Sequence, residues 1–346
     1  MATDEKKLAR LRKLGERGTF EPRDPTLRAM MQTLQGEMPE PYAGICTLLD
    51  APHRESLEGL EIALVGVPFD LGVTARPGAR YGPRAIRQIA NVGPYHHRLE
   101  TVPLMQCPMA DVGDVPIHRR FGLDEGIKRI EEYFQRLVSA GVAPLSAGGD
   151  HSITYPILKA VGRDEPLGLV HVDAHCDTGG PFDNSKFHHG GPFRNAVLDG
   201  VLDPERVIQI GIRGTSEVIW DFSYESGMTV IHIEEFHEMG LPAVVEKARE
   251  VIGHGPAYIS FDVDGLDPAF TPGTGTPEVG GLTTIESQAI VRGLRGLHIA
   301  GGDVVEVAPQ YDPTENTARV GAAMMFEILC VLADSVVRHR PPAARD

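Results

Sequence analysis

The sequence predicts one α/β domain in which a parallel sheet is covered by helices on both faces. Two observations lead to this fold class. Short apolar stretches of strand length alternate with longer stretches of helical period along most of the chain, which is the pattern of a parallel sheet with crossover helices. The chain also has 346 residues, 42% of them hydrophobic, so it can bury one large core, and no repeat, low-complexity tract or linker divides it.

The order of elements begins with an extension. Residues 1–58 are polar and contain several prolines, and we expect one or two short helices there but no domain. Residues 59–346 form the predicted α/β domain. Stretches that favour strands lie within residues 61–70, 142–150, 166–173, 206–214, 228–235, 257–264 and 299–307. Stretches that favour helices lie within residues 78–90, 122–141, 240–253, 283–296 and 320–337.

Two of these helices show how the core is built. The helix within residues 122–141 is amphipathic, with one apolar face formed by Ile127, Ile130, Phe134, Leu137 and Val138. Residues 320–337 are apolar almost throughout, but they include Glu327 and Asp334 and are too short and too charged to span a bilayer. We therefore expect a buried helix there and no membrane partner.

Composition excludes several classes of partner. The formal net charge is −15, from 33 basic and 48 acidic residues, which argues against nucleic acid as a partner because phosphates need clustered Lys and Arg. The charged N-terminus lacks the apolar segment of a secretory signal. The four cysteines lie far apart and form neither a zinc-finger spacing nor a disulfide framework. These features predict a cytoplasmic protein with reduced thiols.

Ionisable side chains cluster where the predicted strands end. The motif "GGDH" follows one strand, "DAHCD" the next, "DVDGLD" another, and a lone glutamate ends a fourth. The carboxyl ends of parallel strands meet at one edge of a sheet, so these groups should converge. If the "DAHCD" segment stays extended, its alternate side chains project to one side. The candidate residues are His151, Asp173, His175, Asp177, Asp262, Asp264 and Glu306.

The charge of this cluster predicts metal ions. One divalent ion would leave excess negative charge among the four aspartates, whereas two ions balance it, with aspartates bridging them. Carboxylates with a little imidazole suit Mn²⁺, and Ni²⁺ is the alternative. Two such ions would also acidify a bridging water and so make a nucleophile. Any one of these residues alone is more often structural, but three clusters at three strand ends are hard to obtain by chance.

Neighbouring polar residues are expected to be structural. His171 lies deeper in its strand, where a neighbour can satisfy it, and Asp150 and Asp267 are expected to support turns or the ligands. Cys176 points away from the ligands by its position and is expected to pack in the core.

Longer motifs resemble a known family. They are "RPGARYGPRAIR" at residues 76–87, "GGDHS" at 148–152, "DAHCD" at 173–177, "HGGPFR" at 189–194 and "SFDVDGLDPAFTPGTGTPEVGGL" at 260–282. Together they resemble the agmatinase branch of the arginase-like ureohydrolases, over roughly residues 60–337. The resemblance implies a three-layer α/β/α arginase-type fold with a mostly parallel sheet, a binuclear manganese or nickel centre, and hydrolysis of a small cationic guanidino compound to urea and an amine. It also implies a trimer or hexamer, and a hetero-oligomer with a related chain is the alternative assembly.

The resemblance also assigns roles to residues. It implies that one metal is held by His151, Asp173, Asp177 and Asp262, and the other by Asp173, His175, Asp262 and Asp264. It implies that His189 moves a proton and that Glu306 grips the guanidinium. Asp177 can orient the attacking hydroxide by accepting its hydrogen bond.

The sequence departs from its relatives near the expected substrate pocket. Gly191 stands where close relatives usually have Thr or Ser, and Thr271 stands where they usually have Ala. The missing hydroxyl at residue 191 is expected to enlarge the pocket, which favours a guanidino acid, an alkylguanidine, guanidine or a biguanide over agmatine. A guanidino acid needs a cation for its carboxylate, and Arg194 or Lys186 could supply one.

Three alternatives remain open from the sequence. The chain could be an agmatinase, despite Gly191. It could be a scaffold subunit of a hetero-oligomer, although such a subunit is expected to lose ligands and all six are present here. It could also be a single-metal, deacetylase-like enzyme, against which His175 and Asp264 argue because they complete a second ligand set.

Overall fold

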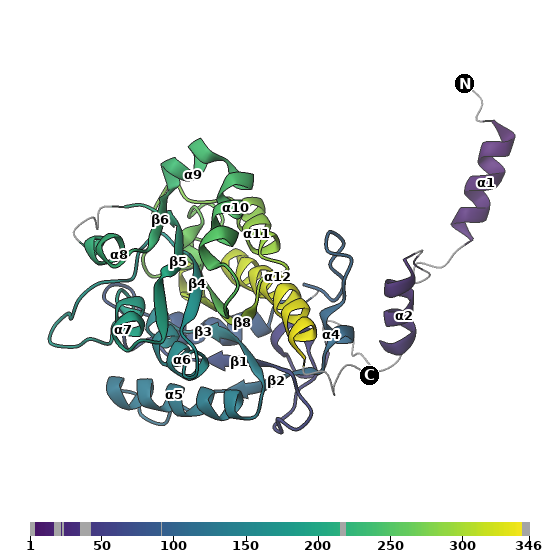
Figure 1. Cartoon of the computed structure of the whole chain (residues 1–346). Coiled ribbons are helices and arrows are strands. Elements are labelled where there is room, and N and C mark those ends of the chain that lie inside the picture. The colour runs from purple at the N-terminus through teal and green to yellow at the C-terminus, as the bar shows by residue number, and fades with distance from the viewer. Residues whose placement is uncertain are drawn as a thin grey trace.

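The protein is described by a computed structural model that covers residues 4–16, 22, 24–34, 43–90, 92–214 and 219–340 (Figure 1). Its centre is an eight-stranded sheet in which all paired strands run parallel, in the order β2-β1-β3-β8-β7-β4-β5-β6. The strands are β1 Ile62–Val67, β2 Met109–Asp114, β3 Ala143–Gly148, β4 Leu167–Val172, β5 Leu202–Ile212, β6 Thr229–His232, β7 Ala257–Asp262 and β8 Ile299–Val305.

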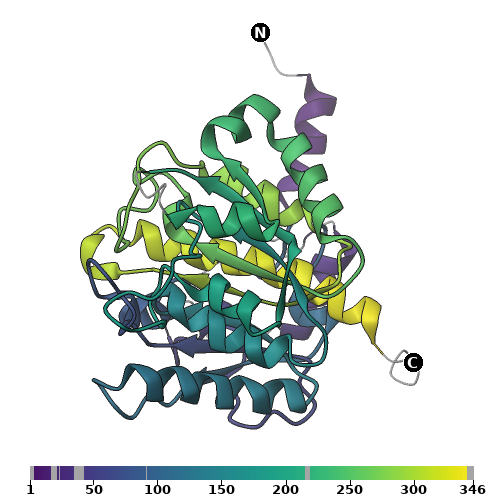
Figure 2. The ribbon, with the colours of Figure 1, turned by 60° about the vertical axis from the view of Figure 1, so that its left-hand side comes forward.

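Helices cover both faces of the sheet (Figure 2). One apolar core joins a face of the sheet to α3, α9, α10, α11 and α12, and a second joins the other face to α5, α6 and α7. The helices are α1 Glu5–Gly15, α2 Pro25–Leu34, α3 Gly82–Arg87, α4 Pro103–Gln106, α5 Leu123–Ser139, α6 Thr154–Val161, α7 Pro192–Leu198, α8 Asp221–Ser226, α9 Ile233–Met239, α10 Leu241–Ile252, α11 Thr284–Gly293 and α12 Asn316–His339. The predicted three-layer α/β/α fold is confirmed.

The strand sequences explain why both faces are covered. Along β1 the side chains alternate, so Ile62 and Leu64 pack in one core while Ala63 and Val65 pack in the other. Every residue of β1, β4 and β7 is buried. A strand that is apolar on both sides needs a helical layer on each, as the alternating sequence pattern predicts.

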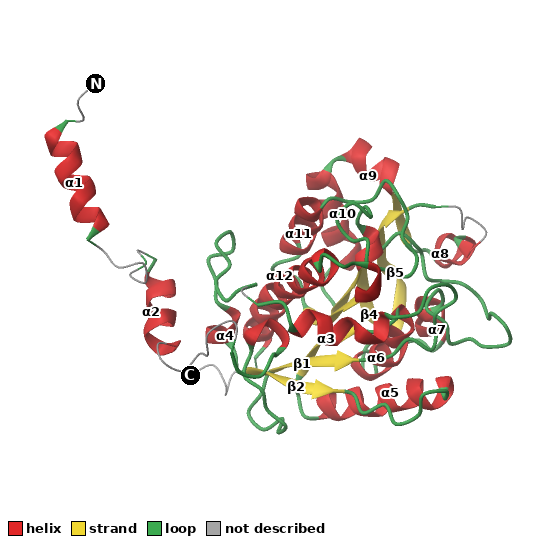
Figure 3. Ribbon diagram, turned by 180° about the vertical axis from the view of Figure 1, so that it is seen from behind, coloured by secondary structure: helices red, strands yellow, loops and turns green. Residues whose placement is uncertain are grey.

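Helix α12 is the buried helix expected at the C-terminal end. It is long and apolar enough to cross a membrane, but 67% of its most apolar window is buried inside the protein. It packs on β8, β3, α3 and α11, in the helical layer on one face of the sheet (Figure 3). Its interior charge Glu327 accepts hydrogen bonds from Arg292, at 2.7 Å from Nη2, and contacts His96. The charged residues inside this apolar stretch are therefore paired.

The sheet contains one strand that the sequence pattern did not indicate. Strand β2, of sequence MADVGD, is the last strand in the sheet order and pairs with β1, and His53 forms an isolated bridge to its Asp111. The other seven strands lie within the predicted stretches, except that β5 begins earlier, at Leu202. The missed strand ends in Val-Gly-Asp, whose glycine and aspartate are rare in strands, so its pattern does not distinguish it from a loop.

The N-terminal extension has the two short helices that were expected. In Figure 1, α1 stands away from the α/β body, and it has no buried residue. Helix α2 is joined to the body: Tyr95 Oη donates at 3.0 Å to Asp24 Oδ2, just before α2, and Met30 is buried. Residues 48–54 also lie against the body: the Leu48 side chain is fully buried, and the backbone of Arg54 donates to Asp111 O at 3.0 Å. The boundary at residue 58 stays a prediction, and parts of the predicted domains, including residues 35–42 and 341–346, lie outside the described residues.

Candidate metal centre and substrate site

The ionisable residues singled out in the sequence meet at the carboxyl ends of four neighbouring strands. Strands β3, β8, β7 and β4 are adjacent in the sheet, and each ends in one of the clusters. His151 follows β3, Glu306 follows β8, Asp262 ends β7, and Asp173 follows β4. Residues more than 150 positions apart in the chain are therefore brought onto one rim, as expected for a parallel sheet.

The segment after β4 bends and does not continue as a strand. Strand β4 ends at Val172, and residues 173–175 form bends, so the conditional expectation of an extended segment is wrong. Asp177 has a left-handed backbone, with φ +51°. The bends and this conformation still bring the carboxylates of Asp173 and Asp177 to the same atom, His151 Nδ1.

His151 presents an unpaired ring nitrogen to three carboxylates. Its Nδ1 lies 3.1 Å from Asp173 Oδ2, 2.9 Å from Asp177 Oδ2 and 3.2 Å from Asp262 Oδ2, and it has no hydrogen-bond partner. Burial alone lowers the pKa of His151, but these three carboxylates raise it well above its ordinary value. A cation, either a proton or a metal ion, is thus favoured between Nδ1 and the carboxylates.

The other ring nitrogen of His151 is fixed by a hydrogen-bond chain. His151 Nε2 lies 2.8 Å from Ser260 Oγ, and Ser260 Oγ donates to Asp303 Oδ1 at 2.7 Å. Because the serine proton goes to Asp303, Ser260 must accept from Nε2–H. This chain leaves Nδ1 as the nitrogen that can bind a metal, which is the usual arrangement of a ligand histidine with an outer partner.

A second donor set overlaps the first. His175 Nδ1 lies 3.3 Å from Asp173 Oδ1 and 3.2 Å from Asp264 Oδ2. One group of possible ligand atoms comes from His151, His171, Asp173 and Asp177, another from Asp173, His175 and Asp264, and within each group the atoms lie within 4.8 Å of one another. Asp173 belongs to both groups, with Oδ2 facing His151 and Oδ1 facing His175, which fits a carboxylate that bridges two ions.

Burial makes the carboxylate cluster unfavourable without cations. Burial and the carboxylates of Asp264 and Asp173 raise the pKa of Asp262 well above its ordinary value. Burial, followed by Asp173, raises the pKa of Asp264 to about 6. Burial also raises the pKa of Asp173, but the surrounding histidines, with His171 first, hold it well below its ordinary value. The donor set therefore fits two divalent ions, which would compensate the buried negative charge.

His171 supports the cluster from behind. Gln209 Nε2 donates to His171 Nδ1 at 3.1 Å, so His171 Nε2 carries the proton and donates to Asp173 Oδ2 at 2.7 Å. This contact is the neighbour that the sequence reading expected for His171. Asp150 and Asp267 support loops through bonds from Gly72 N and Gly280 N, at 2.8 and 2.7 Å.

Glu306 combines one occupied and one free carboxylate oxygen. Its Oε1 accepts from His151 N at 3.0 Å and lies 2.9 Å from His189 Nδ1. Its Oε2 is buried and has no partner. Glu306 also has a left-handed backbone, with φ +63°. A buried, unpaired carboxylate oxygen beside the donor sets is suited to accept an N–H of a cationic ligand.

His189 is held on both ring nitrogens. Its Nδ1 faces Glu306 Oε1, while its Nε2 accepts the backbone N–H of Thr74 at 3.2 Å and lies 2.7 Å from Thr74 Oγ1. Burial lowers the pKa of His189, but the Glu306 carboxylate raises it to about 9. The Thr74 N–H favours a lone pair on Nε2, so His189 takes a second proton there only by giving up that bond.

The loop around Gly191 is filled by a neighbouring side chain. A Cβ atom at Gly191 would lie 2.9 Å from His188 Nε2 and 3.0 Å from Gly179 O. The His188 ring thus occupies the space that the missing hydroxyl was expected to open. The two candidate cations stack on aromatic rings: the Arg194 guanidinium lies 4.5 Å from the Phe222 ring, and the Lys186 ammonium 5.2 Å from the Phe187 ring.

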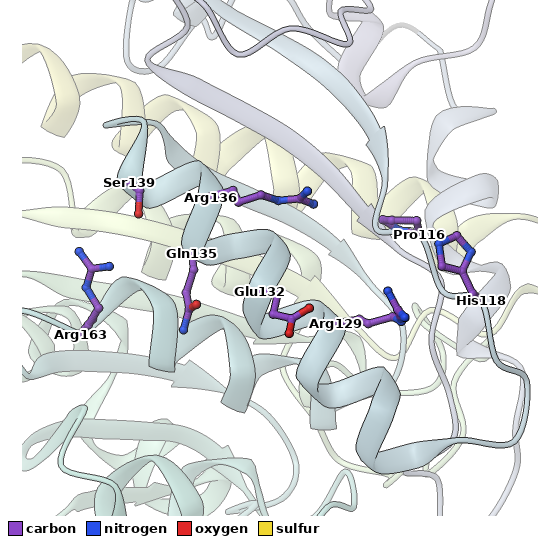
Figure 4. Close-up of a pocket in the computed structure, with 8 residues that line it drawn as sticks. All are labelled: Pro116, His118, Arg129, Glu132, Gln135, Arg136, Ser139 and Arg163. Carbon is purple, nitrogen blue, oxygen red and sulfur yellow. The ribbon is translucent and has the colours of Figure 1, made fainter.

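A separate groove of about 620 Å³ lies on α5, away from these residues (Figure 4). It is lined by Pro116, His118, Arg129, Glu132, Gln135, Arg136, Ser139 and Arg163. The three guanidinium groups point in different directions in Figure 4, so they do not form one anion site. The groove shares no residue with the ionisable cluster.

Ser260, Asp303 and Thr74 are residues that the sequence reading missed. Ser260 and Asp303 are fully buried polar residues inside otherwise apolar strands, which was a usable signal. Thr74 lies on an exposed part of the loop between β1 and α3, and its sequence neighbourhood gives no comparable signal.

Comparisons with known proteins agree with this arrangement. A family profile described as the arginase family matches residues 60–331. A guanidinopropionase of Pseudomonas aeruginosa is 48% identical over 86% of this chain and 94% of its own length. A mitochondrial agmatinase of Gallus gallus is also 48% identical, over 84% of this chain and 86% of its own length. The solved structure of proclavaminate amidinohydrolase from Streptomyces clavuligerus has a TM-score of 0.81 and 36% identity, and covers 86% of this chain and 100% of its own.

Proposed function

Because the chain belongs to the arginase family, we propose that it hydrolyses a guanidino compound to urea and an amine at the rim formed by β3, β8, β7 and β4. One observation carries the proposal: two donor sets share Asp173, and Glu306 bonds the backbone of His151 in one of them through Oε1 while its Oε2 is buried without a partner. A guanidinium held at Oε2 is placed next to the cluster that would activate water, which makes the attack effectively unimolecular.

We assign the metal ligands as the sequence motifs imply. His151, Asp173, Asp177 and Asp262 would hold one ion, and Asp173, His175, Asp262 and Asp264 the other. The ions supply positive charge to the buried carboxylates and lower the pKa of a bound water, so that it is a nucleophile at neutral pH. Support comes from the unpaired His151 Nδ1, which faces oxygens of three of these aspartates. Manganese suits this oxygen-rich set, and nickel is the alternative.

The catalytic roles belong to three side chains. Glu306 accepts guanidinium N–H bonds at Oε2 and fixes the orientation of the planar group. Asp177 accepts a hydrogen bond from the attacking water and orients it. His189 moves a proton as an imidazolium: it takes a second proton at Nε2 from the attacking water and gives it to the departing amine. It then returns to the neutral ring with its proton on Nδ1, 2.9 Å from Glu306 Oε1.

The substrate class is proposed to be a guanidino acid or another small guanidino compound, with Arg194 as the candidate partner for a carboxylate. Agmatine remains the second candidate, because the guanidinopropionase and the agmatinase have the same identity to this chain. The test is urea release from 3-guanidinopropionate, 4-guanidinobutyrate, agmatine, guanidine, dimethylguanidine and a biguanide, after reconstitution with manganese or with nickel. Urea from none of them would overturn the proposed reaction.

A matched variant distinguishes the guanidinium site from the metal centre. Glu306→Gln keeps the size of the side chain and removes the negative charge that binds a guanidinium. We expect this variant to keep its metal content and to lose turnover of every substrate in the panel. Retained turnover would show that Glu306 does not bind the guanidinium.

Assembly and location complete the proposal. We propose a homo-oligomer, a trimer or a hexamer, with a hetero-oligomer as the alternative; light scattering of the purified chain distinguishes these from a monomer. A cytoplasmic location is supported by the four cysteines, Cys46, Cys107, Cys176 and Cys330, which are all unpaired. One domain over residues 59–346 is supported by the match over residues 60–331.

A further inference from the structure

We propose that Thr74 is a positioning residue, which holds His189 in the tautomer with the proton on Nδ1 and thereby keeps Oε2 of Glu306 free for substrate. The inference rests on the proposed function, since it concerns how that site is kept ready. The juxtaposition that carries it is Thr74 on one side of the His189 ring and Glu306 on the other.

The hydrogen bonds define the tautomer. The backbone N–H of Thr74 donates to His189 Nε2 at 3.2 Å, so this nitrogen must offer a lone pair. The Thr74 hydroxyl lies 2.7 Å from the same nitrogen and can donate to it as well. A neutral imidazole with a lone pair on Nε2 carries its proton on Nδ1. That proton then bonds Glu306 Oε1 at 2.9 Å.

The tautomer of His189 determines which carboxylate oxygen of Glu306 is free to bind a guanidinium. Oε1 receives bonds from His151 N and His189 Nδ1, whereas Oε2 has no partner. In the opposite tautomer, Nδ1 would present a lone pair to Oε1, and the two would repel. The carboxylate would then turn to find a donor, and the free oxygen would lose its fixed position. Thr74 acts on the guanidinium site through His189 and does not need to touch the substrate.

The loop that carries Thr74 is anchored on both sides. Two residues earlier, Gly72 N donates to Asp150 Oδ2 at 2.8 Å, and Gly72 O accepts from His189 N at 2.9 Å. Two residues later, Arg76 donates to Thr274 O and Gly275 O at 2.7 and 3.0 Å. These contacts fix the backbone N–H of Thr74 against the ring. The residue is therefore preorganised even though it lies on an exposed stretch of the loop.

The first test uses the kinetics of the metal-loaded enzyme. Thr74→Val keeps the shape and the backbone N–H but removes the hydroxyl, and losing one such hydrogen bond should lower kcat/KM roughly two- to twelve-fold. Thr74→Ser restores the hydroxyl and should bring kcat/KM back to within about two-fold of the parent chain, by the same reasoning. Thr283→Val is the matched control, because the Thr283 hydroxyl donates to Glu286 Oε2, at 2.6 Å, in the first turn of α11; its kcat/KM should stay near the parent value.

The second test reads the tautomer directly and does not need activity. The ring nitrogens of ¹⁵N-histidine-labelled protein are observed by NMR, with His189→Asn as the assignment control. The spectra are recorded at a pH above about 9, because the Glu306 carboxylate raises the pKa of His189 to about 9 and only the neutral ring has a tautomer. There His189 Nε2 of the parent chain should be unprotonated. Thr74→Val keeps the backbone N–H and loses only the hydroxyl, so its signals should move part of the way toward the opposite tautomer. A protonated Nε2 in the parent chain would overturn the proposal. So would a Thr74→Val variant with the same kcat/KM and the same His189 nitrogen signals as the parent chain. A parent chain that shows the expected tautomer but releases no urea would overturn the proposed function alone.

Discussion

Asp177 and Glu306 share a left-handed backbone conformation that residues other than glycine rarely adopt. Their φ angles are +51° and +63°. Such a conformation costs on the order of 1–3 kcal/mol per residue and persists only where the surroundings impose it. In both residues it follows directly on a strand-end cluster and turns the carboxylate toward His151 or its backbone. Among the described residues, eight non-glycine residues have a positive φ, and two of them are proposed catalytic side chains.

The bridging aspartates should be the least replaceable ligands. Asp173→Asn and Asp262→Asn each remove a negative charge that both proposed ions share, so we expect urea release to be abolished and metal content to fall. His171→Gln alters only the support of Asp173 and should cost roughly 10- to 100-fold in metal affinity or activity. Steady-state kinetics and elemental analysis of the three variants check this. Near-normal turnover in Asp262→Asn would show that the ligand set is misassigned.

Gly191→Thr should disturb the loop before it changes substrate preference. The new Cβ would contact His188 Nε2 at 2.9 Å and Gly179 O at 3.0 Å. Overpacking of this kind costs about 1–3 kcal/mol, so we expect thermal stability and kcat/KM for every guanidino compound to fall.

Removing the His188 ring separates the effect of overpacking from the effect of the new hydroxyl on substrate preference. The double variant Gly191→Thr with His188→Ala has room for the hydroxyl, and we expect its ratio of agmatine to guanidino-acid turnover to rise above that of the parent chain. If Gly191→Thr alone keeps the parent kcat/KM for the whole panel, His188 does not limit this loop.

Among single residues, the sequence reading singled out the candidate ligands and missed the residues that support them. The candidates stand out because imidazoles and carboxylates recur at short spacing after apolar strands. Ser260 and Asp303 lie in different strands, β7 and β8, and their contact depends on the register between these strands. A single buried polar residue indicates that a partner exists but does not identify it.

At the scale of elements, β2 shows where sequence patterns fail. The strand is held at the sheet edge by a buried ion pair as well as by apolar packing. Asp111 accepts from Arg87 Nε at 2.8 Å, and also from Leu48 N and Gly113 N at 2.8 and 2.9 Å. An aspartate followed by Val-Gly-Asp favours a turn by composition, and partners distant in the chain, Arg87 and Leu48, help to stabilise a strand there.

Asp111→Ala should therefore destabilise the protein strongly. It leaves the largely buried Arg87 guanidinium without its main partner, and breaking such a pair typically costs about 3–5 kcal/mol. Asp114→Ala is the matched control, because Asp114 also bonds Arg87, at 2.5 Å, but its side chain is 45% exposed. Exposed pairs contribute about 0–1 kcal/mol. Urea unfolding measures both variants, and equal losses of stability would contradict this account of β2.

At the scale of the whole molecule, the site is a product of strand order. The alternation of strands and helices predicts a parallel sheet and places all the clusters on one rim. It does not predict that β3, β8, β7 and β4 are neighbours, because that order joins strands far apart in the chain. The family resemblance, and not the strand pattern, implied that His151 meets Asp262. The contact of His189 with Glu306 was found in the structure.

The strand order also gathers buried carboxylates, so we expect the stability of the folded chain to depend on bound metal ions. Removing the metal tests this expectation. Four aspartates are gathered at the carboxyl ends of β4 and β7, and all four are buried. Cations that bind only the folded state add RT ln(1 + [L]/Kd) to stability, about 2.7 kcal/mol when the free ion is at a hundred times its Kd. We expect chelation to lower the midpoint of thermal unfolding and to abolish urea release together, and we expect both to return on adding two equivalents of manganese or nickel. The control is Asp262→Asn, whose unfolding midpoint should respond much less to the added metal. Elemental analysis of the restored protein should approach two ions per chain, and a stable value of one with full activity would rule out the binuclear centre.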